Sequence, residues 1–292
     1  MRPNYAILGR LALFATALIW GTSFVVLKNA LDSIGTLWIL AIRFTAATAL
    51  MLVLIRGRLR NISPRCLAGS ALMGVSLAAA YIIQTFGLYD TTPGKNAFLT
   101  ATYCVLTPFL AWLFYRRRPV FSNILAAVLC LTGIGFVSLG TGFGQLNRGD
   151  VLTLCSGLFY SLQIILMENY IDSGEAAAIS AVQFLTAAVI CWAGALLFET
   201  PPVGVSARAW LEVGYLSVMC TGVCFFLQAW GMRYTPASSA AIIMTLEAVF
   251  GAIVSVLFYH EIVTGKIALG FVLIFSSVVM NELRPFRGKK LA

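Results

Sequence analysis

The strongest constraint on this chain is a series of ten apolar stretches, each close to the length at which a helix crosses a lipid bilayer. A helix rises about 1.5 Å per residue, so roughly 20 apolar residues span a hydrocarbon core of about 30 Å. The stretches cover residues 11–27, 37–55, 67–88, 97–115, 120–139, 151–167, 176–198, 210–232, 237–259 and 267–280. They are too long for strands and lack the alternation of apolar and polar residues found in membrane β-barrels. We therefore predict an all-α integral membrane protein with ten transmembrane helices.

The composition excludes an ordinary soluble domain. Of the 292 residues, 60% are apolar and 11% are charged, and the mean hydropathy is +0.91, whereas charged residues make up about 25% of a soluble domain. The formal net charge of +9 does not indicate nucleic-acid binding, because the basic residues lie in short connections and near the chain ends. There they orient helices and contact anionic lipid headgroups. We expect the lipid bilayer, and no nucleic acid, as the partner of this surface.

The positions of the basic residues predict the orientation of the chain. With a cytoplasmic N-terminus, the cytoplasmic segments hold fourteen Lys and Arg residues and the opposite segments hold five, which predicts that both termini are cytoplasmic. The fourteen are Arg2, Arg10, Arg56, Arg58, Arg60, Arg65, Arg116, Arg117, Arg118, Arg233, Arg284, Arg287, Lys289 and Lys290, and the five are Lys28, Lys95, Arg148, Arg208 and Lys266. Two arginines precede the first stretch, as in a signal peptide. Because Trp20-Gly-Thr-Ser continues that stretch, we expect a retained span.

Two segments about half the chain apart share one pattern. The matching motifs are Gln84-x-x-Gly87 with Gln228-x-x-Gly231, Thr92-Pro93 with Thr235-Pro236, and Leu113-Phe-Tyr115 with Leu257-Phe-Tyr259, at offsets of 143 to 144 residues. A weaker match at an offset of 140 sets Thr16, Trp20, Ser23 and Leu27 on Ser156, Tyr160, Gln163 and Met167. Each of these two sets has the spacing of one helix face. Repeats of this size in an apolar chain are typical of transporters.

The repeat has a consequence for topology. Five spans in each copy is an odd number, so the second copy must cross the membrane in the opposite orientation. The flanking charges agree, since the first Leu-Phe-Tyr precedes three arginines and the second precedes His260-Glu261. We therefore predict two inverted five-helix units, residues 1–142 and 143–292, around a central cavity. The glycine-rich segment 140–144 is the expected connection, and because it follows a span rather than a strand, its pattern argues against nucleotide binding.

Further short motifs complete the pattern. They are Leu-Glu-Ala-Val-Phe at 246–250, Phe258-Tyr-His-Glu261, Arg43-Phe44, Asn96-Ala-Phe-Leu-Thr and Pro108. With the duplicated Thr-Pro turns, the chain resembles the drug/metabolite transporter superfamily over essentially its whole length, and more closely the bacterial branch with two EamA-type repeats. The resemblance implies a ten-helix bundle in the bacterial inner membrane that moves small metabolites by alternating access. Many members carry Leu-Glu-Pro-Val where this chain has Leu246-Glu-Ala-Val249, which leaves open whether the helix bends there.

Polar side chains within the spans are the candidate site, because such groups are costly in lipid and usually face the bundle interior or a water-filled cavity. We predict twelve cavity residues: Trp20, Ser23, Arg43, Tyr81, Gln84, Asn96, Thr100, Tyr103, Tyr160, Gln163, Gln228 and Glu247. Asn96, Thr100, Tyr103 and Thr107 have the spacing of one helix face. For this stripe and for the glutamines, hydrogen bonding between helices is the alternative. Aromatic side chains with polar tips suit ammonium or aromatic groups, and ordinary packing is the alternative for them.

Arg43 and Glu247 are the clearest charges within the spans. Counted at about 1.5 Å per residue from opposite ends of their helices, both lie near the middle of the bilayer. An unpaired arginine there costs roughly 2.5–3.5 kcal/mol. We therefore expect the two side chains to be close enough to interact, and Glu247 to recognise substrate or a coupling proton. A fixed salt bridge that only sets the helix register is the alternative.

Catalysis and metal binding find little support in the sequence. The seven cysteines lie in or beside apolar stretches, which favours buried small side chains over disulfides. The single histidine, His260, is at a helix end and has no buried nucleophile to pair with. We expect no enzyme activity, no metal and no cofactor.

Among transporters, an exporter of amino acids or related compounds is the first prediction. A sugar-phosphate carrier would place several basic residues within the spans, and only Arg43 lies there. Efflux of drugs or toxic compounds and uptake of metabolites are the alternatives with the same fold. A scaffold or receptor without transport is the alternative from another class. We expect a monomer or a weak dimer, with protons as a candidate coupling ion.

Overall fold

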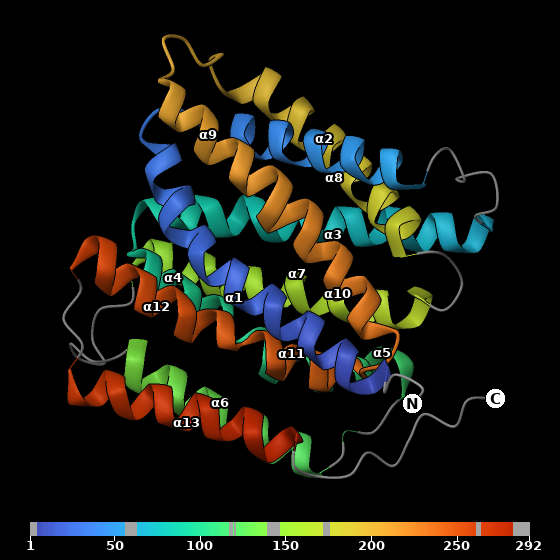
Figure 1. The fold of residues 1–292 in the computed structure, drawn as a ribbon, viewed down its shortest axis with the longest axis vertical. Coiled ribbons are helices and arrows are strands. Elements are labelled where there is room, and N and C mark those ends of the chain that lie inside the picture. The colour runs from blue at the N-terminus through green and yellow to red at the C-terminus, as the bar shows by residue number, and fades with distance from the viewer. Residues whose placement is uncertain are drawn as a thin grey trace.

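The computed structural model describes residues 5–55, 63–116, 119, 121–138, 147–171, 176–260 and 264–282. All regular elements among these residues are helices (Figure 1), and none of these residues forms a strand. The α-helices are α1 (Tyr5–Leu31), α2 (Thr36–Ile55), α3 (Pro64–Tyr89), α4 (Pro93–Thr100), α5 (Tyr103–Tyr115), α6 (Phe121–Ser138), α7 (Arg148–Tyr170), α8 (Ala176–Phe198), α9 (Ala207–Tyr215), α10 (Cys224–Met232), α11 (Ala237–Met244), α12 (Leu246–Tyr259) and α13 (Gly265–Glu282). The segment η3 (Leu216–Val223) is a π-helix between α9 and α10.

Some sequence predictions fall outside the described ranges. They concern the connection 140–144, the boundary between residues 142 and 143, Glu261, and the basic residues Arg2, Arg56, Arg58, Arg60, Arg117, Arg118, Arg284, Arg287, Lys289 and Lys290. These remain predictions.

Within the described ranges, eight helices are long and apolar enough to cross a membrane. They are Tyr5–Leu31, Thr36–Ile55, Pro64–Tyr89, Pro93–Tyr115, Arg148–Tyr170, Ala176–Phe198, Ala207–Met232 and Ala237–Tyr259. The two other predicted stretches form α6 and α13, whose apolar parts, Asn123–Phe136 and Ala268–Ser277, are shorter. The prediction of an all-α membrane protein is confirmed, and eight of the ten predicted spans have the length and hydropathy of membrane helices.

The helices form an elongated bundle with a helix pair at each end of its long axis (Figure 1). α2 packs on α8 at one end, and α6 packs on α13 at the other. Between these pairs, α1 contacts α10 and α12, while α3 contacts α7 and α8. The first turn of α1 and the last turn of α13 lie toward the same side of the bundle in this view. The inner faces of α1, α3, α7, α10 and α12 therefore enclose the middle of the molecule.

Two of the spans are interrupted near their middle. Ala101 and Thr102 separate α4 from α5, and Thr245 separates α11 from α12. The hydroxyls of Thr102 and Thr245 each donate to the carbonyl three residues earlier, at 2.7 and 2.5 Å. Such local bonds compete with the regular helical hydrogen bonds and let the chain bend. The sequence predicted one span over each of 97–115 and 237–259 and left open whether the second bends at 246–249. The structure divides both, and the second bend forms without a proline.

A third irregularity lies in the span that contains η3. The Thr221 hydroxyl donates to the carbonyl of Leu216, five residues earlier, at 2.9 Å, which follows the wider spacing of a π-helix. The sequence predicted an uninterrupted α-helix over 210–232. The π-helical turn re-aims the residues that follow it, and Thr221 itself points into the bundle, where it is fully buried.

The turn between α3 and α4 uses the residues that the duplicated motif contains. The Thr92 side chain accepts a hydrogen bond from the backbone N–H of Lys95 at 3.3 Å, which satisfies one of the free N–H groups at the helix start. Pro93 begins α4, where its missing N–H leaves no hydrogen bond unmade.

Two lysines tie this end of the bundle together. Lys28 on α1 donates to the carbonyls of Leu88 and Tyr89 at 2.6 and 3.2 Å, at the C-terminus of α3, where the helix dipole favours a cation. Lys95 pairs with Asp150 at the start of α7 at 2.6 Å. These contacts connect the C-terminal ends of α1 and α3 and join the N-terminal ends of α4 and α7.

Candidate functional site

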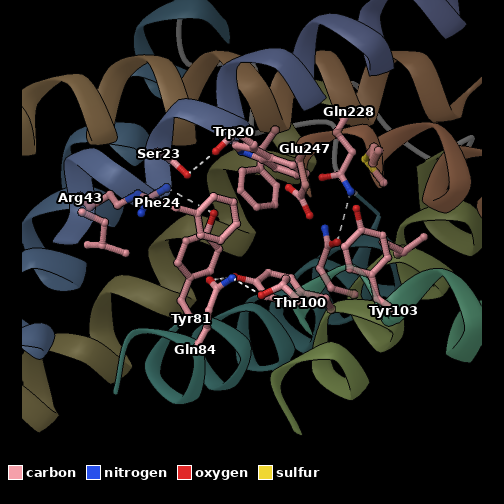
Figure 2. A pocket seen from close by; sticks show the side chains of 16 residues that line it. Trp20, Ser23, Phe24, Arg43, Tyr81, Gln84, Thr100, Tyr103, Gln228 and Glu247 are labelled. Atoms are coloured by element: carbon pink, nitrogen blue, oxygen red, sulfur yellow. Dashed lines mark hydrogen bonds between the residues drawn. The ribbon is translucent and has the colours of Figure 1, made fainter. Parts of the chain in front are cut away.

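A cavity lies in the middle of the bundle, and side chains from seven helical spans line it (Figure 2). Its sixteen lining residues are Trp20, Ser23, Phe24 and Leu27 on α1, Arg43 on α2, Tyr81 and Gln84 on α3, Thr100 on α4, Tyr103 on α5, Tyr160, Gln163 and Ile164 on α7, Phe225 and Gln228 on α10, Met244 on α11 and Glu247 on α12. Eleven of the twelve residues predicted from the sequence are among them, and Asn96 is not. The cavity thus gathers polar groups that are up to 227 positions apart, from Trp20 to Glu247.

Asn96 lies between helices instead. Its side-chain amide is fully buried and donates to the Thr153 hydroxyl on α7 at 2.8 Å. Thr107, from the same predicted stripe, donates to the Ser161 hydroxyl at 3.3 Å. The stripe divides by distance from the break after α4. Thr100 and Tyr103 beside the break face the cavity, and the outer two residues join α4 and α5 to α7.

Both breaks lie at the cavity. Thr100 and Tyr103 stand on either side of the first, and Met244 and Glu247 stand on either side of the second. Glu247 is in the first turn of α12, where the helix dipole stabilises negative charge. The break therefore creates a helix N-terminus beside the cavity, and Glu247 lies in its first turn. An unbroken helix would have no N-terminus at this depth.

Arg43 enters the cavity from α2 and has only 1% of its surface exposed. Its Nε donates to the hydroxyl of Thr221 in η3, and a terminal nitrogen donates to the Tyr81 hydroxyl at 3.3 Å. The guanidinium carbon also lies 4.7 Å from the centroid of the Tyr81 ring, within the range of a cation–π interaction. These contacts hold the guanidinium in place and use only part of its five N–H donors.

Glu247 is buried, with 4% of its surface exposed. It forms no ion pair with Arg43, although both residues lie in the described part of the chain. Figure 2 shows Arg43 and Tyr103 on opposite sides of the cavity, with Glu247 between them. Tyr103 lines the cavity together with Glu247, and its hydroxyl has no hydrogen-bond partner among the described residues. The alternative of a fixed Arg43–Glu247 salt bridge is therefore wrong for this conformation, and an interaction between the two over a longer distance stays a prediction.

Two networks of hydrogen bonds shape the polar walls. In the first, Gln84 donates to the Thr100 hydroxyl at 2.7 Å and accepts from the Tyr160 hydroxyl at 2.6 Å. In the second, Gln228 donates to Gln163 at 3.4 Å, and Gln163 donates to Gln183 at 3.1 Å. Both alternatives considered for the glutamines thus occur together, since these side chains line the cavity and also join helices.

Aromatic rings form the remaining walls. Trp20 packs edge-on against Phe225, with ring centroids 5.1 Å apart, and Tyr81 packs edge-on against Tyr160 at 5.5 Å. The Trp20 indole donates to the carbonyl of Cys220 at 2.7 Å. Its N–H therefore points to η3, and its apolar ring lines the cavity. Ser23 donates to the Trp20 carbonyl within α1 at 2.7 Å.

The cavity is narrow in this conformation. The centres of water-sized molecules can occupy about 30 Å³ of it, and one water needs about 10–15 Å³ on this measure. The space therefore suits about two waters, and a metabolite would require the walls to separate.

Two polar residues of the site escaped prediction. Thr221 holds Arg43, and no feature of the sequence marks the π-helical turn that positions it. Gln183 ends the glutamine chain outside the cavity wall. Its signal was present, because Gln183-Phe184 repeats Arg43-Phe44 at the offset of 140 residues that relates other residues of the two halves.

The fold and the site together define a multi-pass membrane protein with a narrow cavity in its interior, lined by polar and aromatic side chains. The profile of the EamA-like transporter family matches residues 7–139 and again residues 147–282. The chain therefore belongs to this family, in the drug/metabolite transporter superfamily, and is a membrane transporter.

Related proteins and structures agree with this assignment. An uncharacterized transporter of Archaeoglobus fulgidus is 32% identical over 274 residues, which cover 94% of this chain and 85% of that protein. The uncharacterized transporter YoaV of Bacillus subtilis is 22% identical over 96% of this chain and 98% of its own. A solved crystal structure has the same fold, with a TM-score of 0.76 at 17% identity over 93% of this chain and 95% of its own.

Proposed function

We propose that the protein is a secondary active transporter that exports amino acids or related small metabolites by alternating access, with the central cavity as its binding site. The observation that carries this proposal is the pair of separated charges in the cavity. Arg43 keeps free N–H donors on one side, and Glu247 has no cationic partner among the described residues. A zwitterion carries the two complementary groups, and burying a charge without a partner is costly. Binding would pair both.

Two inverted five-helix units, residues 1–142 and 143–292, are the architecture that we propose for this mechanism. Helix bounds support it, because α2 and α8 begin 140 residues apart, and α6 and α13 begin and end 144 residues apart. α6 and α13 have 18 residues each, or about 27 Å of helix, which makes them suitable as the two remaining spans, the fifth and the tenth in chain order. The residues Arg116 and His260, which end α5 and α12, share a positive φ of 53° and are also 144 positions apart.

Close helix contacts support the same relation. A Cβ atom on Gly87 of α3 would lie 2.7 Å from the Gly149 carbonyl oxygen of α7, and one on Gly231 of α10 would lie 2.7 Å from the Gly9 carbonyl oxygen of α1. Small residues permit such approaches between membrane helices. The second pair follows from the first by the offsets of 144 and 140 residues. The Gly87–Gly149 contact and the Gly231–Gly9 contact are thus equivalent under the proposed repeat.

Alternating access requires the cavity to open at one end while the other end stays closed. The narrow cavity and the lysine contacts of α1 and α4 at one end suit a closed intermediate. Glu247 is the group that we assign to proton coupling, since it faces the cavity together with Arg43, Tyr81, Tyr103 and Tyr160 and lacks a fixed cation. A proton and an ammonium group would then compete for the same carboxylate.

The orientation with both termini cytoplasmic, and the bacterial inner membrane as location, belong to the same proposal. They rest on the distribution of basic residues and on the family. A monomer is sufficient for this mechanism, because one chain supplies the whole cavity wall.

The test is counterflow of radiolabelled amino acids in proteoliposomes that contain the purified protein. Glu247→Gln is expected to weaken the transport of amino acids about tenfold or more, because a hydrogen bond to a charged group is lost, and to abolish any response to a proton gradient. Arg208→Gln is the control, since this side chain is 80% exposed and pairs with Glu212 away from the cavity. Full transport by Glu247→Gln, with its pH dependence intact, would refute the assigned role of Glu247.

Efflux of aromatic or cationic compounds is the second candidate. The rings of Trp20, Tyr81, Tyr160 and Phe225 on the cavity walls favour it, because such rings bind flat or cationic groups. Counterflow with an aromatic amine that lacks a carboxylate distinguishes the two. An amine of this kind that is transported equally by the unaltered protein and by Arg43→Gln would favour this candidate over amino-acid export.

A further inference from the structure

The glutamine chain beside the cavity has a direction and an open end. Gln183 accepts from Gln163, and Gln163 accepts from Gln228. All three side chains are buried, with 1% or less of their surface exposed. Two amide atoms at the ends of the chain have no hydrogen-bond partner among the described residues. They are the Nε2 of Gln183 and the Oε1 of Gln228. The orientation of each amide in the chain is therefore coupled to that of the next.

The open carbonyl belongs to a residue that lines the cavity. Gln228 is on α10, and Figure 2 shows it, with Tyr103 and Glu247, on the side of the cavity away from Arg43. A primary amide offers either donors or acceptors, and which end it presents depends on the bonds of its other end. With its Nε2 bound to Gln163, Gln228 presents its oxygen. A buried acceptor without a donor is unfavourable and is satisfied when a ligand supplies one.

Gln183 sets this polarity from outside the cavity. It lies on α8 and does not line the cavity wall. Its Oε1 receives the Gln163 amide, which leaves the Gln163 oxygen to receive Gln228. Chains of hydrogen bonds polarise one another in a low-dielectric interior, so the effect of Gln183 reaches the cavity through two amides.

We infer that Gln183 is a positioning residue that makes Gln228 a hydrogen-bond acceptor, so that the site selects substrates with an N–H or O–H donor, such as a primary ammonium group, beside Glu247. This inference rests on the proposed function for the transported compound. It adds a requirement that charge alone does not impose. Glu247 attracts any cation, whereas the Gln228 oxygen forms a hydrogen bond only with a group that carries an N–H or O–H.

The experiment has one arm that needs no substrate. Thermal unfolding of the purified full chain is measured for Gln228→Met, Gln163→Met and Gln183→Met, which keep similar volumes. Gln163→Met removes the centre of the chain and leaves two amides unpaired, so its Tm is expected to fall by about 3 °C or more. Gln228→Met removes an amide that is half unsatisfied, and its Tm is expected to change less. A fall for Gln228→Met equal to that for Gln163→Met would show that its oxygen is already bound, and would overturn the inference.

The second arm uses leucine and N,N,N-trimethylleucine as probes, because both are zwitterions and only leucine has N–H donors. The unaltered protein is expected to bind leucine about tenfold more tightly than its trimethyl analogue, measured by ligand-induced thermal shift. Gln183→Met is expected to lose this preference while Gln183→Glu, which still accepts from Gln163, keeps it. A packing role for Gln183 would affect both variants alike and leave the preference unchanged, which would overturn the inference. Absence of leucine binding to the unaltered protein would refute the proposed substrate, and the first arm would still decide whether the Gln228 oxygen is unbound, which the inference requires.

Discussion

The contact between Lys95 and Asp150 provides the sharpest energetic test of the packing at the end of the bundle. Asp150 is fully buried, and Lys95 is 26% exposed. The carboxylate accepts from Lys95 at 2.6 Å, from the Thr91 hydroxyl at 3.0 Å and from the Asn147 backbone N–H at 3.0 Å. It therefore joins the turn before α4 and the start of α7. We expect Lys95→Met to destabilise the protein because it leaves this buried charge with only two neutral donors.

The magnitude follows from the burial of the two partners. Breaking a fully buried ion pair costs about 3–5 kcal/mol, and an exposed pair contributes about 0–1 kcal/mol. Because Lys95 keeps a quarter of its exposure, we expect a loss of about 2 kcal/mol for Lys95→Met, a factor of about 30 in the folding equilibrium. Asp150→Asn keeps one oxygen, which can accept from Thr91, loses the acceptor of the Asn147 N–H, and frees a lysine that can reach water, so its cost is about 1–2 kcal/mol.

A double-mutant cycle isolates the pair. Equilibrium unfolding of the purified protein in detergent gives the free energies of Lys95→Met, Asp150→Asn and the double variant. The double variant is expected to lose about 1.5 kcal/mol less than the sum of the single losses, because the buried charge has also been removed. Lys266→Met, at an exposed lysine, is the control and should stay within about 0.5 kcal/mol. Additive effects, or a Lys95→Met variant as stable as the control, would refute this account.

Two further predictions use the same unfolding measurement. Gly87→Ala is expected to cost about 1–3 kcal/mol, because the new Cβ would meet the Gly149 backbone, whereas Gly214→Ala has open space around its Cβ and should be neutral or stabilising by about 0.5–1 kcal/mol; equal effects would contradict the close approach of α3 and α7. Thr221→Val is expected to cost about 1–3 kcal/mol and to weaken amino-acid transport, because Arg43 loses its acceptor. The control is Thr132→Val, at an exposed hydroxyl on α6, which should change neither stability nor transport. Unchanged stability and transport in Thr221→Val would contradict the role of η3.

The sequence predicted the helical spans well because lipid leaves few alternatives. A chain of this hydropathy must satisfy its backbone groups within helices, and polar side chains within them turn away from lipid. The same reasoning selected residues such as Gln84, Tyr160 and Glu247, which lie around one cavity. Only direction toward the interior was needed for this prediction. The inward faces of these helices meet near one axis. A prediction that a side chain points inward was therefore nearly sufficient to place it at the cavity.

The predictions that needed local geometry were less successful. Counting residues along two ideal helices brought Arg43 and Glu247 to similar depths, but depth does not fix lateral distance across the cavity. The break before α12 and the π-helical turn at Thr221 also change which way each side chain points. Such irregularities depend on a few backbone hydrogen bonds, as at Thr245, and residue type alone does not specify them. Asn96 was assigned to the cavity because it shares a helix face with Thr100, but its amide bonds to Thr153 on α7 instead.

The proposed duplication bears on why a cationic donor, Arg43, and an anionic acceptor, Glu247, lie at separate places on the cavity wall. An inverted repeat with identical copies would present the same groups on both sides of its axis. Here the positions related by 140 residues hold Arg43 and Gln183, and those related by 144 residues hold Tyr103 and Glu247. Arg43 and Glu247 occupy positions that the repeat does not relate, so it gives no reason for them to meet, and Thr221 and Tyr81 hold the arginine instead. Under the proposed duplication, the separation of donor and acceptor that would orient a zwitterion therefore comes from divergence between the halves. Glu247 stands on the interrupted span formed by α11 and α12, and Arg43 stands on the unbroken helix α2.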